Sequence, residues 1–320
     1  MAILNLLDLQ PTTISRDLRD KYILLYGPAK CGKTSFAAQI PNNLIFCFEK
    51  GVNFLPGVFA VDVPKWVEFK ALLKQLEKDE IKQKFKTVTI DTVSLAYDLC
   101  TQYICSQNNV KTLGDIAYGK GYALVKDEFT NSLRQISMLG YGIVLITHAK
   151  VKNVKIDDDT TVEIASPNIP DRAQDVVNAL VDIIGYIDVS YENGIATRTL
   201  VTRGTPNIVA GSRLKYLASR IPFGYDELIN AIGEAIEKQA KIDGAKVVDK
   251  GTMQKVIEKR PFEETLAEAK ELWTKLVSEG KAEVVMAEVE SLFGEPMKLS
   301  EIPESKQDIF EVLIEDMRSM

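Results

Sequence analysis

The octapeptide Gly-Pro-Ala-Lys-Cys-Gly-Lys-Thr at residues 27–34 constrains this chain more than any other feature. It follows the apolar run 22–26 and precedes the helix-favouring residues 35–38, so the sequence predicts a strand, a glycine-rich loop and a helix in that order. Gly27 and Gly32 let the backbone turn tightly, and successive N–H groups then join the helix N-terminus in an anion-binding cup. We therefore predict a phosphate-binding loop.

The loop also predicts individual roles. Lys33 can reach the β- and γ-phosphates of a nucleotide, and the Thr34 hydroxyl can hold Mg²⁺. The residues expected to contact the nucleotide are Gly27, Pro28, Ala29, Lys30, Cys31, Gly32, Lys33, Thr34 and Ser35. Such a loop by itself fits a kinase, a GTPase or an ATPase, so other residues must narrow the choice.

Short apolar runs alternate with segments of helical periodicity along most of the chain, which is typical of an α/β fold with a mostly parallel sheet flanked by helices. The predicted strands are residues 22–26, 44–48, 87–91, 142–148, 182–190 and 196–202, and the predicted helices begin near 34 and cover 65–80, 95–105, a segment ending near 139, and 173–180. The Asn193-Gly194 turn predicts that the last two strands form an antiparallel edge. Residues 150–163 predict a further hairpin, with acidic residues 157–159 at its tip.

The composition is that of a soluble globular protein, with 46% hydrophobic and 26% charged residues among 320. No apolar run approaches the roughly 18–20 residues of a membrane span, and the N-terminus lacks the basic start and cleavage site of a signal peptide. We expect a cytoplasmic protein without a membrane partner. The four cysteines, Cys31, Cys47, Cys100 and Cys105, have no zinc-ligand spacing, and we expect them to be reduced.

Charge divides the chain into three predicted pieces. The net charge of −6 lies entirely in residues 241–320, which carry 12 basic and 18 acidic residues. Within them, 241–260 is polar and basic and suits a linker, whereas 261–320 is acidic. Helical periodicity at 262–280, 281–293 and 305–317 predicts a small helical module there. We therefore predict a core at 1–240, a linker at 241–260 and an acidic C-terminal module at 261–320.

Three polar residues follow predicted strands. Asp91 closes the strand 87–91, where a second acid would hold Mg²⁺ through water. Glu49 ends the second predicted strand, which begins at residue 44, and can polarise a water that attacks the γ-phosphate. His148 closes the strand 142–148 and can sense a bound triphosphate. The carboxyl ends of parallel strands share one edge of a sheet, so we expect these residues to meet the phosphate loop.

In this order, the phosphate loop and the segments 44–49, 87–91 and 142–148 resemble the core of RecA-type ATPases. The resemblance is greatest to the phage nucleotide-binding proteins, AAA-domain phage ATPases, that act with single-strand annealing and recombination functions. It covers residues 20–235 and implies a RecA-like P-loop NTPase core with ATP and Mg²⁺ as cofactors. It further implies that Glu49 activates water and that His148 reports the γ-phosphate to a DNA-binding segment.

The resemblance also implies two mobile loops that hold single-stranded DNA, at 111–122 and 150–170. The first offers Tyr118, Lys120 and Tyr122, and the second offers Lys150, Lys152 and Lys155. Aromatic faces beside positive charges suit base stacking combined with phosphate contact. Because the core is neutral overall, the expected DNA binding is weak and sensitive to salt.

The segment 202–207 resembles the one from which ring helicases and recombinase filaments extend a basic finger into a neighbour's nucleotide site. Arg203 is the first candidate for this catalytic role, and Arg213 is the second. A cation delivered in this way stabilises charge on the transferred phosphoryl group. The resemblance therefore implies a homo-oligomer, as a ring or a filament. The acidic module departs from a minimal RecA core and is a candidate docking site for a protein partner.

We interpret the chain as a Mg²⁺-dependent P-loop ATPase that binds single-stranded DNA in phage-type recombination or replication. One alternative is a helicase or helicase loader of the same superfamily. Another is an adaptor gated by nucleotide that binds ATP without appreciable turnover. A small-molecule kinase is disfavoured, because the sequence contains no arginine-rich segment resembling a lid.

Overall fold

The computed structural model describes residues 14–15, 21–155, 161–192, 195–244, 247–248 and 261–320. The chain divides into two compact units. The larger lies within residues 12–252, and the described part of the smaller is residues 261–320. Each unit has a buried core of its own. Within the described residues, no helix is long and apolar enough to cross a lipid bilayer.

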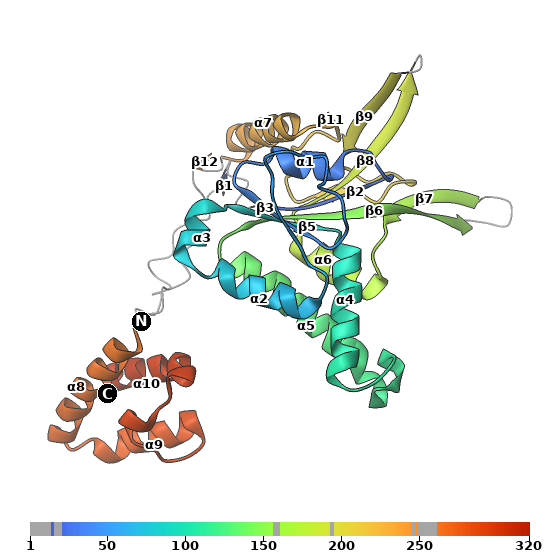
Figure 1. Ribbon diagram of the computed structural model, residues 1–320. Helices are drawn as coiled ribbons and strands as arrows, with labels where there is room; N and C mark the ends of the chain where they lie inside the picture. Colours follow the sequence, from blue (N-terminus) through green and yellow to red (C-terminus); the bar gives the residue numbers. More distant parts are fainter. Residues whose placement is uncertain (1–13, 16–20, 156–160, 193–194, 245–246, 249–260) are drawn as a thin grey trace. The chain divides into compact units, whose positions relative to one another are not determined.

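The larger unit is built on a parallel sheet, as the sequence predicts (Figure 1). Six strands pair in parallel in the order β8-β2-β6-β5-β3-β4. Their bounds are β2 Tyr22–Gly27, β3 Asn43–Cys47, β4 Phe59–Asp62, β5 Thr87–Asp91, β6 Gly142–Lys155 and β8 Ile183–Glu192. The sequence analysis did not predict β4, a strand of only four residues at the rim of the sheet, where its side chains are mostly exposed.

Antiparallel strands extend the sheet. Their bounds are β7 Thr161–Pro167, β9 Ile195–Val201, β10 Gly211–Ser212 and β11 Arg220–Pro222. β8 and β9 pair antiparallel, as predicted, but β9 also pairs with β11, so β11 and not β9 is the edge strand. The predicted hairpin is confirmed as β6 and β7, which pair from Ala149↔Pro167 to Lys155↔Thr161. The predicted tips at 157–159 and 193–194 lie outside the described residues.

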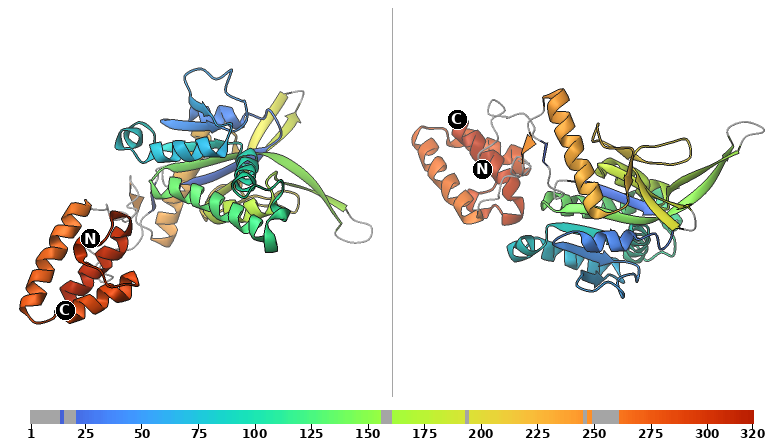
Figure 2. Two further views of the ribbon diagram at one scale, coloured as in Figure 1. Left: turned by 60° about the horizontal axis from the view of Figure 1, so that its bottom comes forward. Right: turned by 90° about the horizontal axis from the view of Figure 1, so that it is seen from above.

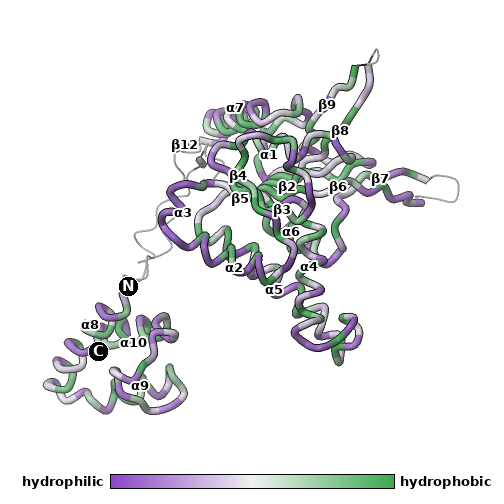
Figure 3. The backbone as a smooth tube through the Cα atoms, viewed as in Figure 1, coloured by the Kyte–Doolittle hydropathy of each residue, from purple (hydrophilic) through white to green (hydrophobic). Residues whose placement is uncertain are grey.

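Helices cover both faces of the sheet (Figures 1 and 2). α1 and α7 lie on one face, and α2, α4, α5 and α6 lie on the other. The bounds are α1 Lys33–Gln39, α2 Trp66–Leu76, α3 Asp79–Lys84, α4 Val93–Gln107, α5 Lys120–Met138, α6 Asp171–Leu180 and α7 Tyr225–Asp243. Successive side chains of a strand point to opposite faces of the sheet. Leu24 therefore belongs to the core that α2 covers, whereas Ile23 and Leu25 belong to the core that α1 and α7 cover. Figure 3 shows the resulting concentration of hydrophobic residues in the central strands.

The predicted mobile loop at 111–122 is instead regular. It contains two short 3₁₀ helices, η3 Leu113–Asp115 and η4 Ala117–Gly119, and α5 begins at Lys120. The Asp115 carboxylate accepts hydrogen bonds from the Thr112 backbone N–H at 2.9 Å and from its hydroxyl at 3.0 Å, which caps η3. Gly121 lies so close to the Leu113 carbonyl that a Cβ would be 2.7 Å from its oxygen. These contacts stabilise a regular conformation in residues 111–122, although their polarity and glycines favour the prediction of a loop.

The predicted basic linker at 241–260 begins inside α7, which continues to Asp243. Residues 247–248 form β12, which pairs in parallel with β1, Ile14–Ser15, in the stretch expected to be an irregular arm. The change in charge placed the end of the core at residue 240. The helix α7 extends three residues past that boundary. Residues 245–246 and 249–260 of the predicted linker lie outside the described part of the chain.

The described part of the smaller unit, residues 261–320, consists of three helices and two 3₁₀ turns. The bounds are α8 Phe262–Ser278, α9 Ala282–Phe293, η5 Leu299–Glu301, η6 Glu304–Lys306 and α10 Gln307–Ser319, and the three predicted helices are confirmed. Their buried faces meet through Ala269, Val289 and Phe310. Inside this core the Thr265 hydroxyl donates a 2.6 Å hydrogen bond to the carboxylate of Glu311, which is 4% exposed.

The packing of α2 yields a test of the fold. Phe69 is fully buried, and its ring lies 4.9–5.5 Å from those of Trp66, Phe48 and Phe46. Phe69→Ala should lower the free energy of unfolding by about 3–5 kcal/mol, because it leaves a cavity that the layers cannot refill. The matched control on the same helix is Val67→Ala, since Val67 is 55% exposed and its loss should cost less than about 0.5 kcal/mol.

The two tryptophans lie one in each unit, Trp66 on α2 and Trp273 on α8. Urea unfolding should therefore be followed by fluorescence in a Trp273→Phe background, which reports on the larger unit alone. Equal losses of stability for Phe69→Ala and Val67→Ala would contradict the described packing.

Candidate nucleotide-binding site

The phosphate loop lies between β2 and α1 and depends on its glycines. Gly32 has φ +100°, a left-handed conformation that favours glycine, and Lys30 has φ +61°. A Cβ on Gly27 would lie 2.9 Å from the Ile187 Cβ, and a Cβ on Gly32 would lie 2.8 Å from a guanidinium nitrogen of Arg198. The close approach of Ile187 disfavours a side chain at residue 27, and the left-handed backbone disfavours one at residue 32.

Lys33 is buried at the start of α1 and is 6% exposed. Its ammonium group donates hydrogen bonds to the backbone carbonyls of Pro28 at 2.7 Å and Gly27 at 3.2 Å. The lysine thus bridges two backbone carbonyls of its own loop. A phosphate oxygen could replace these carbonyls as the acceptor, because an ammonium group bonds more strongly to an anion.

Thr34 and Asp91 join the loop to β5. The Thr34 hydroxyl donates a 2.6 Å hydrogen bond to the Asp91 carboxylate, which is 6% exposed. Burial raises the pKa of the Asp91 carboxyl, the hydrogen bond from Thr34 opposes this, and the negative charge of Glu49 adds to the rise. A hydroxyl and a carboxylate are oxygen ligands of the kind that Mg²⁺ takes.

These two groups fit Mg²⁺ only together with phosphate oxygens. Among the described residues, no three His, Cys, Asp or Glu side chains cluster to hold a metal ion by themselves. Mg²⁺ in proteins is commonly bound by one or two carboxylates plus the substrate's phosphates. The donor set of Thr34 and Asp91 beside a phosphate loop therefore suits a metal that arrives with a nucleotide.

Glu49 and His148 meet above the loop. The His148 Nε2 atom lies 3.2 Å from the Glu49 Oε2 atom, and both side chains are partly exposed. Glu49 does not end a strand: β3 ends at Cys47, and the Glu49 backbone N–H then donates to the Asp91 carbonyl at 3.1 Å. The added backbone bond holds Glu49 at the edge of the sheet.

The prediction that His148 ends a strand is wrong. β6 runs on to Lys155, and His148 is where its pairing partner changes. Gly27↔His148 is the last parallel pair with β2, and Ala149↔Pro167 is the first antiparallel pair with β7. The hairpin satisfies the backbone groups that β2 leaves unpaired, so the strand continues past the edge of the parallel sheet.

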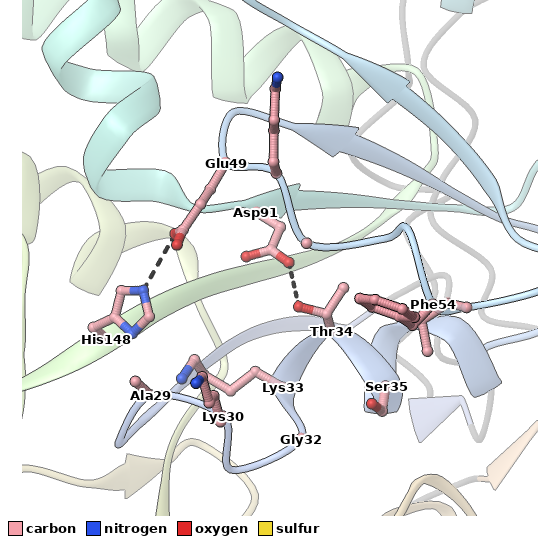
Figure 4. Close-up of a pocket in the computed structure, with 13 residues that line it drawn as sticks. Ala29, Lys30, Gly32, Lys33, Thr34, Ser35, Glu49, Phe54, Asp91 and His148 are labelled. Carbon is pink, nitrogen blue, oxygen red and sulfur yellow. Dashed lines mark hydrogen bonds and ion pairs between the residues drawn. The ribbon is translucent and has the colours of Figure 1, made fainter.

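These side chains line a single pocket of about 410 Å³ (Figure 4). Its lining residues are Ala29, Lys30, Gly32, Lys33, Thr34, Ser35, Glu49, Lys50, Gly51, Phe54, Leu55, Asp91 and His148. The structure thus brings together groups from four separated segments of the chain. The sequence motifs did not point to Lys50, Gly51, Phe54 and Leu55, among which the aromatic Phe54 is 96% exposed.

The two predicted finger arginines do not line this pocket. The Arg203 guanidinium donates to the backbone carbonyls of Leu214 and Lys215 in its own chain. Arg213 pairs with the Asp182 carboxylate at 3.0 Å and donates to the Ala179 carbonyl at 2.7 Å. Each is tied to its own subunit, and a role in a neighbour's site would first require these bonds to break.

The residues expected to contact DNA lie in two segments, 118–122 and 150–155, and the first turn of α6 contacts both. Arg172, in the first turn of α6, stacks 3.9 Å from the centroid of the Tyr122 ring. Its neighbour Asp171 lies 3.8 Å from the Lys152 ammonium. Tyr118 is 96% exposed, and Lys120 and Tyr122 lie in the first turn of α5 rather than in a loop.

Along β6 the three lysines do not share one face. Lys150 and Lys152 are two residues apart and point to the same side of the strand, whereas Lys155 falls on the other side. The Lys150 ammonium donates to the Ile169 carbonyl at 2.9 Å, and burial followed by the charge of Lys152 lowers the pKa of Lys150.

All four cysteines are free and buried. Burial, with the charges of Asp91 and Asp62, raises the pKa of the Cys47 thiol to about 11. Cys47 is therefore protonated at neutral pH and is a poor nucleophile.

A family model described as an AAA domain matches residues 19–214 of this chain. The match covers more than half of the sequence, and the chain belongs to this family of AAA-domain proteins. Membership makes it a nucleotide-binding ATPase at the level of the superfamily, as the sequence motifs predict.

One relative is similar over nearly the whole chain. It is the SPbeta prophage-derived uncharacterized protein YorG of Bacillus subtilis strain 168, which is 26% identical over 326 residues and covers 97% of each chain. The similarity therefore extends beyond the AAA domain into the C-terminal residues.

The buried Asp91 carboxylate generates a prediction about stability. Asp91→Asn should raise the free energy of unfolding of the nucleotide-free protein at pH 8 by roughly 1–2 kcal/mol, because it removes a buried charge and keeps an oxygen for the Thr34 hydroxyl. With a raised pKa, folded Asp91 holds its proton to higher pH than the unfolded chain does, so wild-type stability falls as the pH rises through the folded-state pKa.

The gain from Asp91→Asn should consequently shrink as the pH is lowered toward about 4, the unfolded-state pKa of an aspartate. Urea unfolding at several pH values measures this, with Asp62→Asn at the exposed end of β4 as the control. A gain for Asp91→Asn that does not change with pH, or a loss at pH 8, would contradict the description of this carboxylate.

Proposed function

We propose that this protein is a Mg²⁺-dependent ATPase that acts on single-stranded DNA in phage-type recombination or replication. The observation that carries the proposal is the pocket in which Lys33, Thr34, Asp91, Glu49 and His148 meet. This set supplies a phosphate cradle, oxygen ligands for a metal, and a carboxylate beside the place where the γ-phosphate would lie. The prophage origin named for YorG supports the phage setting.

In the proposed reaction, Lys33 and the loop N–H groups hold the phosphates, and Thr34 and Asp91 hold Mg²⁺, directly or through water. Mg²⁺ would neutralise charge on the β- and γ-phosphate oxygens. Glu49 orients the attacking water for in-line displacement. His148 uses only the Oε2 atom of Glu49, which leaves Oε1 as an acceptor for that water. Bringing the triphosphate into the pocket would then change the Glu49–His148 pair.

The link from nucleotide to DNA that we propose runs along β6. His148, Lys150 and Lys152 are at alternate positions of one strand and therefore lie on one of its faces. A second pocket, of about 540 Å³, is lined by Glu49 and His148 together with Lys150 and residues 168–170. A rearrangement of the Glu49–His148 pair would thus alter the positions of Lys150 and Lys152, which we propose contact DNA phosphates.

Three further parts of the proposal concern assembly. We propose that the protein forms a ring or filament in the host cytoplasm, that its working boundaries are a core at 1–240, a linker at 241–260 and a module at 261–320, and that this acidic module binds a protein partner. The separate core of the three C-terminal helices supports an independent docking role. The same observation favours a second candidate function, an adaptor that binds ATP without appreciable turnover.

A turnover assay tests the enzymatic proposal. Lys33→Ala should abolish both ATP binding and hydrolysis, because the phosphates lose their buried cation. Glu49→Gln should retain ATP binding and lower the rate of hydrolysis by a factor of about 10²–10⁴, since the water loses its general base. Lys241→Ala, at the exposed end of α7, is the control and should leave both unchanged.

Three results would decide between the proposals. Unchanged hydrolysis in Lys33→Ala would contradict the proposed site. ATP binding with negligible turnover in the unmodified protein, with and without single-stranded DNA, would favour the adaptor. ATP-driven movement along DNA would favour the helicase alternative.

The DNA part is tested by measuring single-stranded DNA affinity at several salt concentrations. Lys152→Ala should weaken binding and make the slope of log K against log salt concentration shallower by about 0.7, which corresponds to one lost phosphate contact. Lys241→Ala, on the opposite face of the sheet, should change neither quantity. Binding that Lys152→Ala leaves unchanged in strength and slope would remove Lys152 from the proposed DNA surface.

A further inference from the structure

The outer side of the phosphate loop is formed by the β8–β9 ribbon of the same chain. Gly27 lies against Ile187 of β8. Beyond it, a guanidinium nitrogen of Arg198, on β9, donates a 3.3 Å hydrogen bond to the Cys31 carbonyl. The same nitrogen lies 2.8 Å from the position that a Cβ on Gly32 would take. Arg198 is thus in direct contact with the loop, whereas the predicted finger residues Arg203 and Arg213 are not among the residues that line the pocket.

The backbone of Arg198 is fixed independently of the loop. Its carbonyl accepts a 3.0 Å hydrogen bond from the Phe223 N–H, which continues the pairing of β9 with β11. The Phe223 ring stacks on the Phe36 ring of α1, with 5.5 Å between centroids and 19° between planes. Arg198 therefore reaches the loop from a rigid support that is itself packed against the helix following the loop.

The hydrogen bond to Cys31 has a geometric consequence for its neighbour. In a planar trans peptide the C=O and the following N–H point in opposite directions. Because Arg198 holds the Cys31 carbonyl on the outside of the loop, the Gly32 N–H points away from Arg198, toward the inside. An inward N–H is what an anion-binding cup needs, and the left-handed Gly32 would otherwise leave this peptide free to rotate.

The charge of Arg198 is balanced differently from that of two nearby arginines. Arg213 and Arg220 are neutralised by Asp182 and Asp188, at 3.0 Å and 2.6 Å. Among the described residues, no ion pair joins Arg198 to a carboxylate, and its side chain is exposed. A positive charge that is accessible to solvent and not balanced by an acid would attract an anion at the adjoining loop.

We infer that Arg198 is a positioning residue of the nucleotide site: it holds the Cys31–Gly32 peptide in the orientation that binds phosphate and adds a positive charge to the outer side of the loop. This inference rests on the proposed nucleotide site and extends it to a residue of the same subunit on β9. Its effect is on the affinity for the phosphate chain, whatever base the nucleotide carries.

Three variants test the inference by equilibrium binding, with ATP and with inorganic tripolyphosphate, both in Mg²⁺. Arg198→Met removes the donor and the charge and should raise the dissociation constants of both ligands about tenfold or more, which corresponds to about 1.4 kcal/mol. Arg198→Lys keeps a charged donor and should return both to within about threefold of the unmodified protein. Arg220→Met, an equal loss of charge on neighbouring β11, should change neither by more than about twofold.

The salt dependence and the melting temperature separate positioning from a merely structural role. The dependence of ATP affinity on salt should be shallower in Arg198→Met and restored in Arg198→Lys, while the melting temperatures of the ligand-free proteins stay alike. If Arg198→Met binds tripolyphosphate as tightly as the unmodified protein, the inference is overturned and the nucleotide site stands. Arg198→Lys behaving like Arg198→Met, with an equal drop in melting temperature, would also overturn it. If the unmodified protein binds neither ligand, the proposed function fails, and the inference fails with it.

Discussion

The parallel register of β2, β6, β5 and β3 is the constraint on which the candidate site depends. The pairs Gly27↔His148, Asp91↔Ile146 and Cys47↔Asp91 lie at the carboxyl ends of these strands. They bring the phosphate loop, the acid on β5 and the histidine on β6 to one edge of the sheet. A slip of one residue in any pairing would turn the side chains of that strand to the opposite face. The pocket therefore exists only in this register, which the apolar cores on both faces maintain.

The site concentrates buried charge that the ligand-free protein satisfies internally. Lys33 bonds to carbonyls of its own loop, and Asp91 accepts from Thr34 across the intervening strand β6. Each of these bonds uses a group that a nucleotide or its metal would need. The protein is thus arranged so that ligand binding exchanges one set of partners for another, which avoids leaving a buried charge without a partner.

Local sequence patterns were sufficient to predict the helices and strands whose residues carry a clear signal of their own. The complete loop motif identified β2 and α1, and apolar runs identified β3 and the core of β6, because buried parallel strands are continuously apolar. β-branched residues identified β5. The short rim strand β4 was missed, and its side chains are mostly exposed. Continuation of β6 past His148 was also missed, because the partner that satisfies its backbone, β7, comes later in the chain.

Contacts between distant segments set the remaining features. Lys120 and Tyr122 were expected in a loop, but the cap at Thr112 and the close approach of Gly121 to Leu113 order that stretch. No local pattern could have chosen Arg198 over Arg203, because the choice depends on which strand passes the loop. Asp91 could be identified as a site residue from the sequence, because the carboxyl ends of parallel strands lie at the same edge of the sheet.

The central claim is that these edge groups bind one magnesium triphosphate. Calorimetric titration of the unmodified protein with a non-hydrolysable ATP analogue, in Mg²⁺ and again in excess EDTA, tests it most directly. The account predicts one nucleotide per chain in Mg²⁺ and an affinity at least about tenfold weaker in EDTA, because Thr34 and Asp91 then contribute no metal-mediated contact. Equal affinity in the two conditions, or no binding in either, would contradict it.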